Sequence, residues 1–217
     1  MPKVFYDDDD IHAYSGNHLP HWESKTRRIY HISFHLADSV PAAQIKIWLS
    51  ERERLSELLQ REHREYTSFE IEYLNYLYSE NVEYYLNSGY GACLLKKAEV
   101  ASIVKQAIEY NHTKRYLLKC WCIMPNHVHI LVSFLSFNDM RDILHGWKSY
   151  TAHKINRLLG RTGPLWEPDA YNHIIRTPEE YYQQSRYIWN NPEKAGMKNW
   201  PWRWSCLESG HETVSQM

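Results

Sequence analysis

Four stretches of the chain have the apolar patterns of β-strands. In residues 30–36 every second residue is apolar, which predicts a strand with one buried face. Residues 116–123 and 127–134 are rich in apolar side chains, and the Pro-Asn pair at Pro125 is typical of a turn between them. A short run at 171–176 has the same character. The pattern therefore predicts four strands, two of which are joined by one turn.

Three helices are predicted from apolar residues at three-to-four spacing and from helix end signals. They span residues 97–110, 138–159 and 178–191. The last begins after Thr177, a capping residue that is followed by proline at the first helical position. We expect this helix to end near Asn191, because the next residue is a proline, which disfavours helical backbone at the residue before it.

Two segments stand outside this set of strands and helices. Residues 42–87 are locally acidic and have a helical pattern, so we interpret them as a helical insertion that packs beside the sheet, away from any catalytic centre. Residues 1–27 show no sustained apolar period and are expected to form an N-terminal arm. The order of elements indicates a single α+β domain over residues 1–217, with helices packed on an antiparallel sheet.

Composition and charge narrow the class of protein. Apolar residues make up 43% of the chain and charged residues 24%, which excludes a largely disordered or fibrous protein. The net charge is only -1, but it is unevenly distributed. Residues 1–110 carry 12 Lys or Arg against 17 Asp or Glu, whereas residues 111–217 carry 13 against 9. The second half is therefore basic, although the total charge gives no sign of a polyanionic partner.

The cysteines and the apolar runs indicate the compartment. The four cysteines show neither Cys-x-x-Cys spacing nor the density of a disulfide framework, so a reducing compartment fits them. The first ten residues lack the apolar core of a signal peptide, and no stretch is long and apolar enough to span a membrane. We expect a soluble, cytoplasmic protein.

Two histidines share one face of the second predicted strand of the hairpin. His127 and His129 are two residues apart, so their imidazoles point the same way from a run that is otherwise almost entirely apolar. Such a pair can bind one divalent cation through ring nitrogens. The alternative is two hydrogen-bonded histidines of the core, and the spacing alone does not separate the two interpretations.

A tyrosine and an asparagine share one face of the last predicted helix. Tyr187 and Asn191 are four residues apart. Tyrosine is a weak nucleophile that needs a cation to polarise the phosphate it attacks, and two imidazoles with one amide oxygen leave metal positions free for that phosphate. Attack would expel a 3′ hydroxyl and leave the 5′ phosphate on the tyrosine, and reversal with a second 3′ end would join strands without ATP. A plain aromatic stripe with Tyr181 and Tyr182 is the competing interpretation.

Residues that could contact DNA lie in the sequence between the histidine pair and the pair of Tyr187 and Asn191. Lys148, Lys154 and Arg157 follow one another on the predicted helix 138–159, where they could neutralise phosphates or simply form a solvated face. Trp166, in a Gly-Pro loop, could stack on a base or pack under the loop. The chain also has nine Trp and 17 Tyr, more rings than a core of this size needs, although core packing explains most of them.

At these residues the sequence resembles the single-tyrosine HUH transposases, specifically the REP-associated tyrosine transposases. The resemblance covers most of the chain outside residues 42–87. Its most specific parts are the Met-Pro-Asn-His-Val-His segment and the Tyr-Ile-x-x-Asn-Pro segment. The matching segments are 19–22, 30–36, 89–92, 121–129, 147–153, 163–166, 187–196 and 200–202.

The resemblance implies a ferredoxin-like (RRM-like) sheet of the HUH endonuclease fold, Mg²⁺ or Mn²⁺ as cofactor, and single-stranded DNA with hairpins formed by palindromic repeats as partner. It puts the nucleophile on Tyr187 and the metal ligands on His127, His129 and Asn191. Relatives include monomers and homodimers, and a dimer could exchange its tyrosine helix. Two other functions remain open: a domesticated hairpin DNA-binding protein without cleavage activity, and a metal-dependent hydrolase of small substrates.

Overall fold

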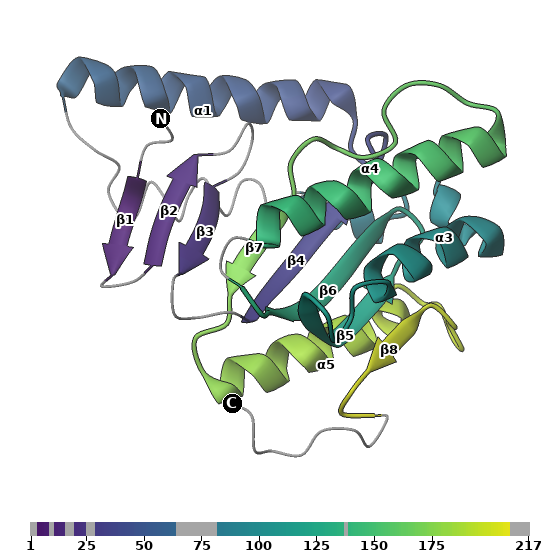
Figure 1. Cartoon of the computed structure of the whole chain (residues 1–217). Helices are drawn as coiled ribbons and strands as arrows, with labels where there is room; N and C mark the ends of the chain where they lie inside the picture. The colour runs from purple at the N-terminus through teal and green to yellow at the C-terminus, as the bar shows by residue number, and fades with distance from the viewer. Residues whose placement is uncertain are drawn as a thin grey trace.

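The structure is a computed structural model that describes the backbone of residues 4–8, 11–15, 20–24, 29–63, 82–136 and 139–208. Its centre is one five-stranded antiparallel sheet (Figure 1). Each strand lies where side chains alternate between two covered faces or form a buried apolar run. The strands are β4 (Ile29–His35), β5 (Tyr116–Ile123), β6 (His127–Phe134), β7 (Tyr171–Ile174) and β8 (Arg203–Ser205).

The order of the strands identifies the topology. In the sheet they follow the sequence β7-β4-β6-β5-β8. From β4 to β7, apart from the helical insertion and one short 3-10 helix, the chain runs strand, helix, strand, strand, helix, strand, which is the β-α-β-β-α-β arrangement of ferredoxin-like folds. The predicted α+β class with a ferredoxin-like (RRM-like) antiparallel sheet is thus confirmed. β8, which was not predicted, adds a fifth strand at the β5 edge.

Helices cover both faces of the sheet (Figure 1). α3 (Ala98–Glu109) and α4 (Asp139–Leu159) pack on one face, where their apolar stripes meet Ile32, Phe34 and Ile130 in the main core. α5 (Pro178–Lys194) packs on the other face, through Tyr181 and Ile188. The sheet therefore separates α4 from α5.

Strand register gathers the polar residues on the α5 face. Ser33 pairs with His129 and His35 pairs with His127, while His31 lies opposite Leu131. Residues that pair across antiparallel strands project to the same side of the sheet. The two histidines of β6 and the two of β4 consequently lie on the face that α5 covers.

The insertion is helical where the structure describes it. α1 (Ala42–Glu62) and residues 82–87 are helices, and residues 64–81 lie outside the described part. Trp48 of α1 packs with Val82 and Leu86 in a small apolar cluster. This cluster fixes residues 82–87 against α1. The short helix η1 (Leu94–Lys96) then leads into α3.

Two boundaries differ from the sequence prediction. The expected arm, residues 1–27, contains three antiparallel strands in the order β1-β2-β3: β1 (Val4–Asp8), β2 (Ile11–Ser15) and β3 (Pro20–Ser24). Ladder hydrogen bonds between neighbours hold them without any regular apolar period. α5 continues to Lys194 instead of ending near Asn191, because Pro192 falls in its last turn, where few further helical bonds remain to be lost.

Within the described residues, the helices are all too short or too polar to cross a membrane. All four cysteines are buried and free of disulfide bonds, as their spacing indicated.

Candidate active site

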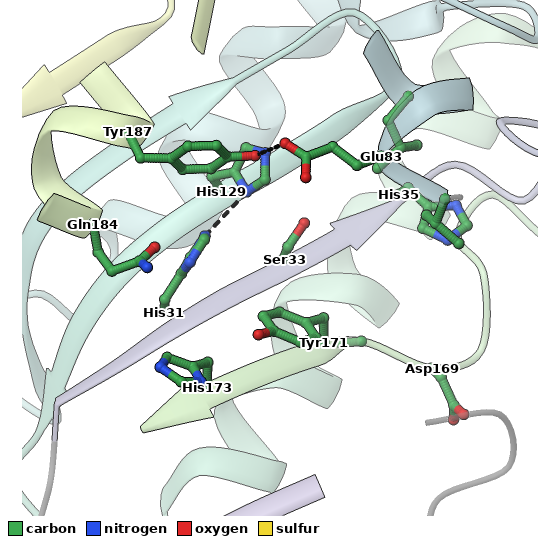
Figure 2. A pocket seen from close by; sticks show the side chains of 13 residues that line it. His31, Ser33, His35, Glu83, His129, Asp169, Tyr171, His173, Gln184 and Tyr187 are labelled. Atoms are coloured by element: carbon green, nitrogen blue, oxygen red, sulfur yellow. Dashed lines mark hydrogen bonds between the residues drawn. The ribbon is translucent and has the colours of Figure 1, made fainter. Parts of the chain in front are cut away.

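A cavity of about 360 Å³ opens on the α5 face of the sheet. Figure 2 shows its walls: histidines of β4 and β7 form the floor, Gln184 and Tyr187 project from α5, and Glu83 approaches from the helical residues 82–87. Its size is within the range of small-ligand sites. The cavity is lined by His31, Ser33, His35, Val82, Glu83, Leu86, His129, Asp169, Ala170, Tyr171, His173, Gln184 and Tyr187.

The paired histidines of β6 are each held by one ring nitrogen. The Nδ1 of His127 lies 2.8 Å from Oδ1 of Asn126, so this nitrogen carries the proton and donates it to the amide oxygen. The Nδ1 of His129 lies 3.1 Å from Nε2 of His31. The two rings are 4.8 Å apart and nearly perpendicular. This arrangement directs the Nε2 atoms away from the supporting contacts, as in histidines that bind metals through Nε2.

Asn126 is fixed in turn by the surrounding backbone. Its Nδ2 donates to the carbonyl oxygen of Tyr90 at 3.0 Å, which directs Oδ1 toward His127. Its own carbonyl oxygen accepts from the hydroxyl of Ser39 and the amide of Leu36. Sequence reasoning assigned the Pro-Asn pair only to a turn. The structure adds that Asn126 orients an imidazole.

All four histidines of this face are neutral at pH 7. Burial lowers the pKa of His127 to about 3 and the pKa of His31 and His35 to about 4, and it holds the pKa of His129 well below 6.5. Neighbouring imidazoles lower the pKa values of His127 and His129 further. A neutral imidazole offers the nitrogen lone pair that a metal ion requires.

Four buried polar atoms of this face of the sheet and of α5 have no hydrogen-bond partner within the described residues: Nε2 of His129, Oδ1 of Asn191, Nε2 of His35 and Oγ of Ser185. A buried polar atom without a partner is costly, and a cation is one way to satisfy it. Two of the four atoms belong to predicted metal ligands, so the donor set fits a divalent metal. No group of three or more His, Cys, Asp or Glu side chains in the described chain could hold a metal, so the predicted set depends on the amide of Asn191 as its third member.

Tyr187 lies beside the imidazoles. Its ring is 5.4 Å from that of His129 and 5.9 Å from that of His31. Its hydroxyl donates a hydrogen bond to Oε1 of Glu83. Burial raises the pKa of Tyr187 well above its ordinary value, Glu83 raises it further, and a hydrogen bond with Asn191 opposes the rise. The phenol therefore keeps its proton at neutral pH.

Glu83 corrects the expectation that the insertion lies away from the catalytic centre. Val82, Glu83 and Leu86 line the cavity together with Tyr187. No sequence pattern indicated this contact, because Glu83 and Tyr187 are 104 residues apart and the acidic residues of the segment look alike. The insertion is thus one wall of the candidate site.

Lys194 is a second residue that sequence reasoning left without a role. Its ammonium nitrogen lies 4.7 Å from the centre of the Tyr187 ring, within the range of a cation–π interaction. Its position in the Asn-Pro-Glu-Lys segment, which is part of the resemblance, was the available signal.

The residues predicted to contact DNA do not line the cavity. Lys148 of α4 donates to the carbonyl oxygens of Glu167 and Pro168 at 2.6 Å and of Asp169 at 3.2 Å, so it fixes the loop that leads into the cavity wall. Lys154 and Arg157 are exposed on α4, which the sheet separates from Tyr187. Contacts of these three with DNA stay predictions.

Trp166 is part of the core. It is only 5% exposed, its ring lies 4.9 Å from that of Phe34, and its indole nitrogen donates to the hydroxyl of Thr151 at 2.8 Å. A base needs an open ring face, which this tryptophan lacks here. Base stacking by Trp166 is therefore corrected to core packing, the alternative that the Gly-Pro loop had left open.

Residues 90–191, just under half of the chain, match a protein family described as Transposase IS200 like. These residues include both histidines of β6, Tyr187 and Asn191. The resemblance that the sequence indicated is thereby confirmed.

Two curated relatives are named REP-associated tyrosine transposases. The REP-associated tyrosine transposase of Escherichia coli (strain K12) is 24% identical over 98 residues, which are 43% of this chain and 57% of the relative. A provisionally named REP-associated tyrosine transposase of Haemophilus influenzae is 25% identical over 118 residues, 48% of this chain and 65% of the relative. The matches thus span less than two thirds of either relative.

Among solved structures, the chain is similar to one described as a REP-associated tyrosine transposase bound to a REP hairpin. The identity is 14% and the TM-score 0.48, over 88% of this chain and 85% of the other.

Proposed function

From the similarity of residues 90–191 to the IS200-like transposases, we propose that this chain is a metal-dependent endonuclease and strand transferase for single-stranded DNA. The observation that carries the proposal is the position of the Tyr187 ring, 5.4 Å from that of His129, next to buried and unpartnered atoms of His129 and Asn191. A core tyrosine does not require this set of neighbours, whereas a nucleophile beside a metal-bound phosphate does.

The metal would be held by Nε2 of His127, Nε2 of His129 and Oδ1 of Asn191. Mg²⁺ or Mn²⁺ bound there would polarise the scissile phosphate and neutralise its charge during attack. Both imidazoles are neutral, and their Nδ1 atoms are held by Asn126 and His31, which orients the Nε2 lone pairs. These features support a catalytic site of three protein ligands with positions left for substrate.

The proposed reaction begins at the hydroxyl of Tyr187. The Tyr187 oxygen attacks phosphorus, the bond from phosphorus to the 3′ oxygen breaks, and the 5′ phosphate remains on the tyrosine. The ester keeps the energy of the broken bond, so the 3′ hydroxyl of a second strand can displace Tyr187 and become joined. Lys194, next to the ring, supplies a positive charge near the incoming phosphate.

The substrate class comes from the relatives and the resemblance. Two curated relatives are named REP-associated, which supports hairpins of palindromic repeats as the DNA that this chain recognises. Unpaired bases beside such a hairpin would lie in the cavity between β4, β7 and α5, where Tyr171 and His173 present rings.

The test is covalent adduct formation. The protein is incubated with single-stranded DNA that carries a hairpin of palindromic repeats from its own genome, with Mn²⁺, and the products are separated under denaturing conditions. We expect a protein–DNA adduct that disappears in Tyr187→Phe and with a chelator. Tyr182→Phe is the matched control, because Tyr182 is on the same helix but 40% exposed.

Two outcomes would count against the proposal. An adduct that persists in Tyr187→Phe would assign the nucleophile elsewhere. Hairpin binding that is equally tight with and without metal, with no adduct, would favour the hairpin-binding protein without cleavage activity.

A further inference from the structure

The proposed reaction leaves one proton without a destination. Tyr187 must lose its hydroxyl proton as its oxygen bonds to phosphorus, and the hydroxyl already donates this proton to Oε1 of Glu83 in a hydrogen bond. The amide oxygen Oδ1 of Asn191 has no hydrogen-bond partner within the described residues, so it is not the acceptor of this proton. An acceptor has to be in contact at the moment of attack.

We propose that Glu83, supplied by the helical insertion, is the general base that takes this proton and the general acid that returns it when strands are joined. This inference rests on the proposed function and deepens it. The geometry that carries it is the hydrogen bond from the Tyr187 hydroxyl to Oε1 of Glu83, drawn as a dashed line in Figure 2. Glu83 touches the reacting oxygen itself, so it is a catalytic residue.

The position of Glu83 is fixed by packing. Val82 and Leu86, which flank it on residues 82–87, are buried at 5% and 6% exposure against Trp48 of α1. The carboxylate thus extends from an anchored helix across the cavity to α5. A base held in place loses little rotational freedom on reaction, which is the condition for efficient proton transfer.

The proton balance of each step is complete. In cleavage, the bond from Tyr187 Oη to phosphorus forms, the bond from phosphorus to the 3′ oxygen breaks, and the phenol proton passes to Glu83. The departing 3′ oxygen takes a proton from a water molecule. In joining, a 3′ hydroxyl attacks phosphorus and loses its proton to solvent, the bond to Tyr187 breaks, and Glu83 returns its proton to the phenolate. Transfer occurs as bonding to phosphorus makes the phenol strongly acidic.

The experiment measures single-turnover adduct formation on hairpin DNA with Mn²⁺, together with hairpin affinity and Mn²⁺ affinity. Glu83→Gln keeps the size and an acceptor oxygen but not the basicity. We expect its rate of adduct formation to fall roughly 100-fold or more, with both affinities within about three-fold of wild type. Joining from purified adduct should fall by the same factor, because one residue serves both directions. Glu83→Asp, which keeps a carboxylate at shorter reach, should retain an intermediate rate.

Glu53→Gln is the matched control, since Glu53 is an exposed glutamate of the same insertion. It should leave all four measurements unchanged. Three results would overturn the proposal. A wild-type rate in Glu83→Gln would show that no base is needed there. A faster rate with tighter hairpin binding would make Glu83 an inhibitory contact, and a large loss of Mn²⁺ affinity would make it a metal ligand.

Failure of the proposed function gives a different pattern. In that case wild-type protein forms no adduct, or Tyr187→Phe still forms it, whatever residue 83 is. An adduct that depends on Tyr187 but not on Glu83 would refute only the role of Glu83.

Discussion

At the scale of single residues, the site is defined by which ring nitrogens are already occupied. His127 and His129 each use Nδ1 for a supporting contact, with Asn126 and with His31. His35 uses its Nδ1 toward the carbonyl of Leu36. A histidine held in this way has one tautomer and one ring orientation, so the supporting residue controls what the imidazole can bind.

Asn126 should therefore control metal affinity without being a ligand. Asn126→Ala removes the acceptor for His127 Nδ1, and we expect Mn²⁺ affinity to fall by about 10- to 100-fold. Titration calorimetry measures this affinity. Asn126→Asp keeps an acceptor oxygen and should retain more of the affinity. Equal affinities in wild type and Asn126→Ala would refute the role.

Lys148 should leave a signature in the pH dependence of stability. Burial lowers its pKa to about 8 in the folded protein, against the attraction of Asp169 and Glu167, from an ordinary value of 10.5. Between these values the unfolded chain binds more protons than the folded one, so the free energy of unfolding should rise with pH from about 8 to about 10.5. Lys148→Met should remove this part of the rise.

Urea unfolding of both proteins over this pH range measures the difference. Other titrating groups contribute to both curves, so the difference between the two slopes isolates Lys148. Parallel curves would show that the ammonium is not desolvated as the structure implies.

Residues related by a local period were predictable, and residues related by tertiary contacts were not. The two-residue spacing of His127 and His129 fixes a common strand face, and the four-residue spacing of Tyr187 and Asn191 fixes a common helix face. The approach of Glu83 depends on how a separate helix packs, which no local pattern encodes. The burial of Trp166 likewise depends on neighbours from β4 and α4.

At the scale of elements, the loop before η1 supports the site through its backbone. Tyr90 accepts from Asn126, and Gly91 passes so close to the 36–40 turn that a Cβ on it would lie 2.5 Å from the carbonyl oxygen of Asp38. The amide of the next residue, Ala92, donates to the Asp38 carboxylate at 2.8 Å. The close approach thus links the loop to the end of β4.

Gly91→Ala should therefore destabilise the protein more than Gly163→Ala, although the two glycines have the same φ angle. Gly91 and Gly163 both have φ +90, but nothing lies within 4 Å of a Cβ on Gly163. We expect Gly163→Ala to lower the free energy of unfolding by about 1–2 kcal/mol through its backbone conformation. Gly91→Ala should cost about 1–3 kcal/mol more through the clash. Urea unfolding compares them, and equal losses would contradict the close approach.

The elements found from sequence were those with a strong apolar period. β5 and β6 have the predicted bounds, because both are buried on two faces and a turn separates them. β8 was missed because it has three residues and pairs only along Cys120 to Cys122. The strands of residues 4–24 were missed because the sequence has no regular apolar period there, and backbone pairing defines the strands.

At the scale of the whole molecule, one chain contains all parts of the candidate site. Tyr187 contacts His129 and Glu83 of its own chain, through α5 on one side and the insertion on the other. A dimer that exchanges tyrosine helices is therefore not needed to assemble the site. The arrangement supports cleavage by a single chain.

Mixing two inactive variants tests this arrangement. Tyr187→Phe lacks the nucleophile and His129→Ala lacks a ligand, so we expect their mixture to form no more adduct with hairpin DNA than either variant alone. Chains of different mass identify the one that is modified. Adduct on the His129→Ala chain in the mixture would demonstrate exchange of the tyrosine between subunits.

Glu83 and Tyr187 are in contact but lie far apart in the sequence, which has a consequence for folding. β5 and β6 are joined by residues 124–126 alone, so their hairpin can form at an early stage, whereas the contact between Glu83 and Tyr187 spans 104 positions. Contacts between residues far apart in the sequence tend to form late, because loop closure costs entropy before the contact is gained. A nascent chain would thus have its imidazole pair in place before Tyr187 meets Glu83. In the proposed reaction, an incompletely folded chain would therefore lack the contact between the nucleophile and its proton acceptor.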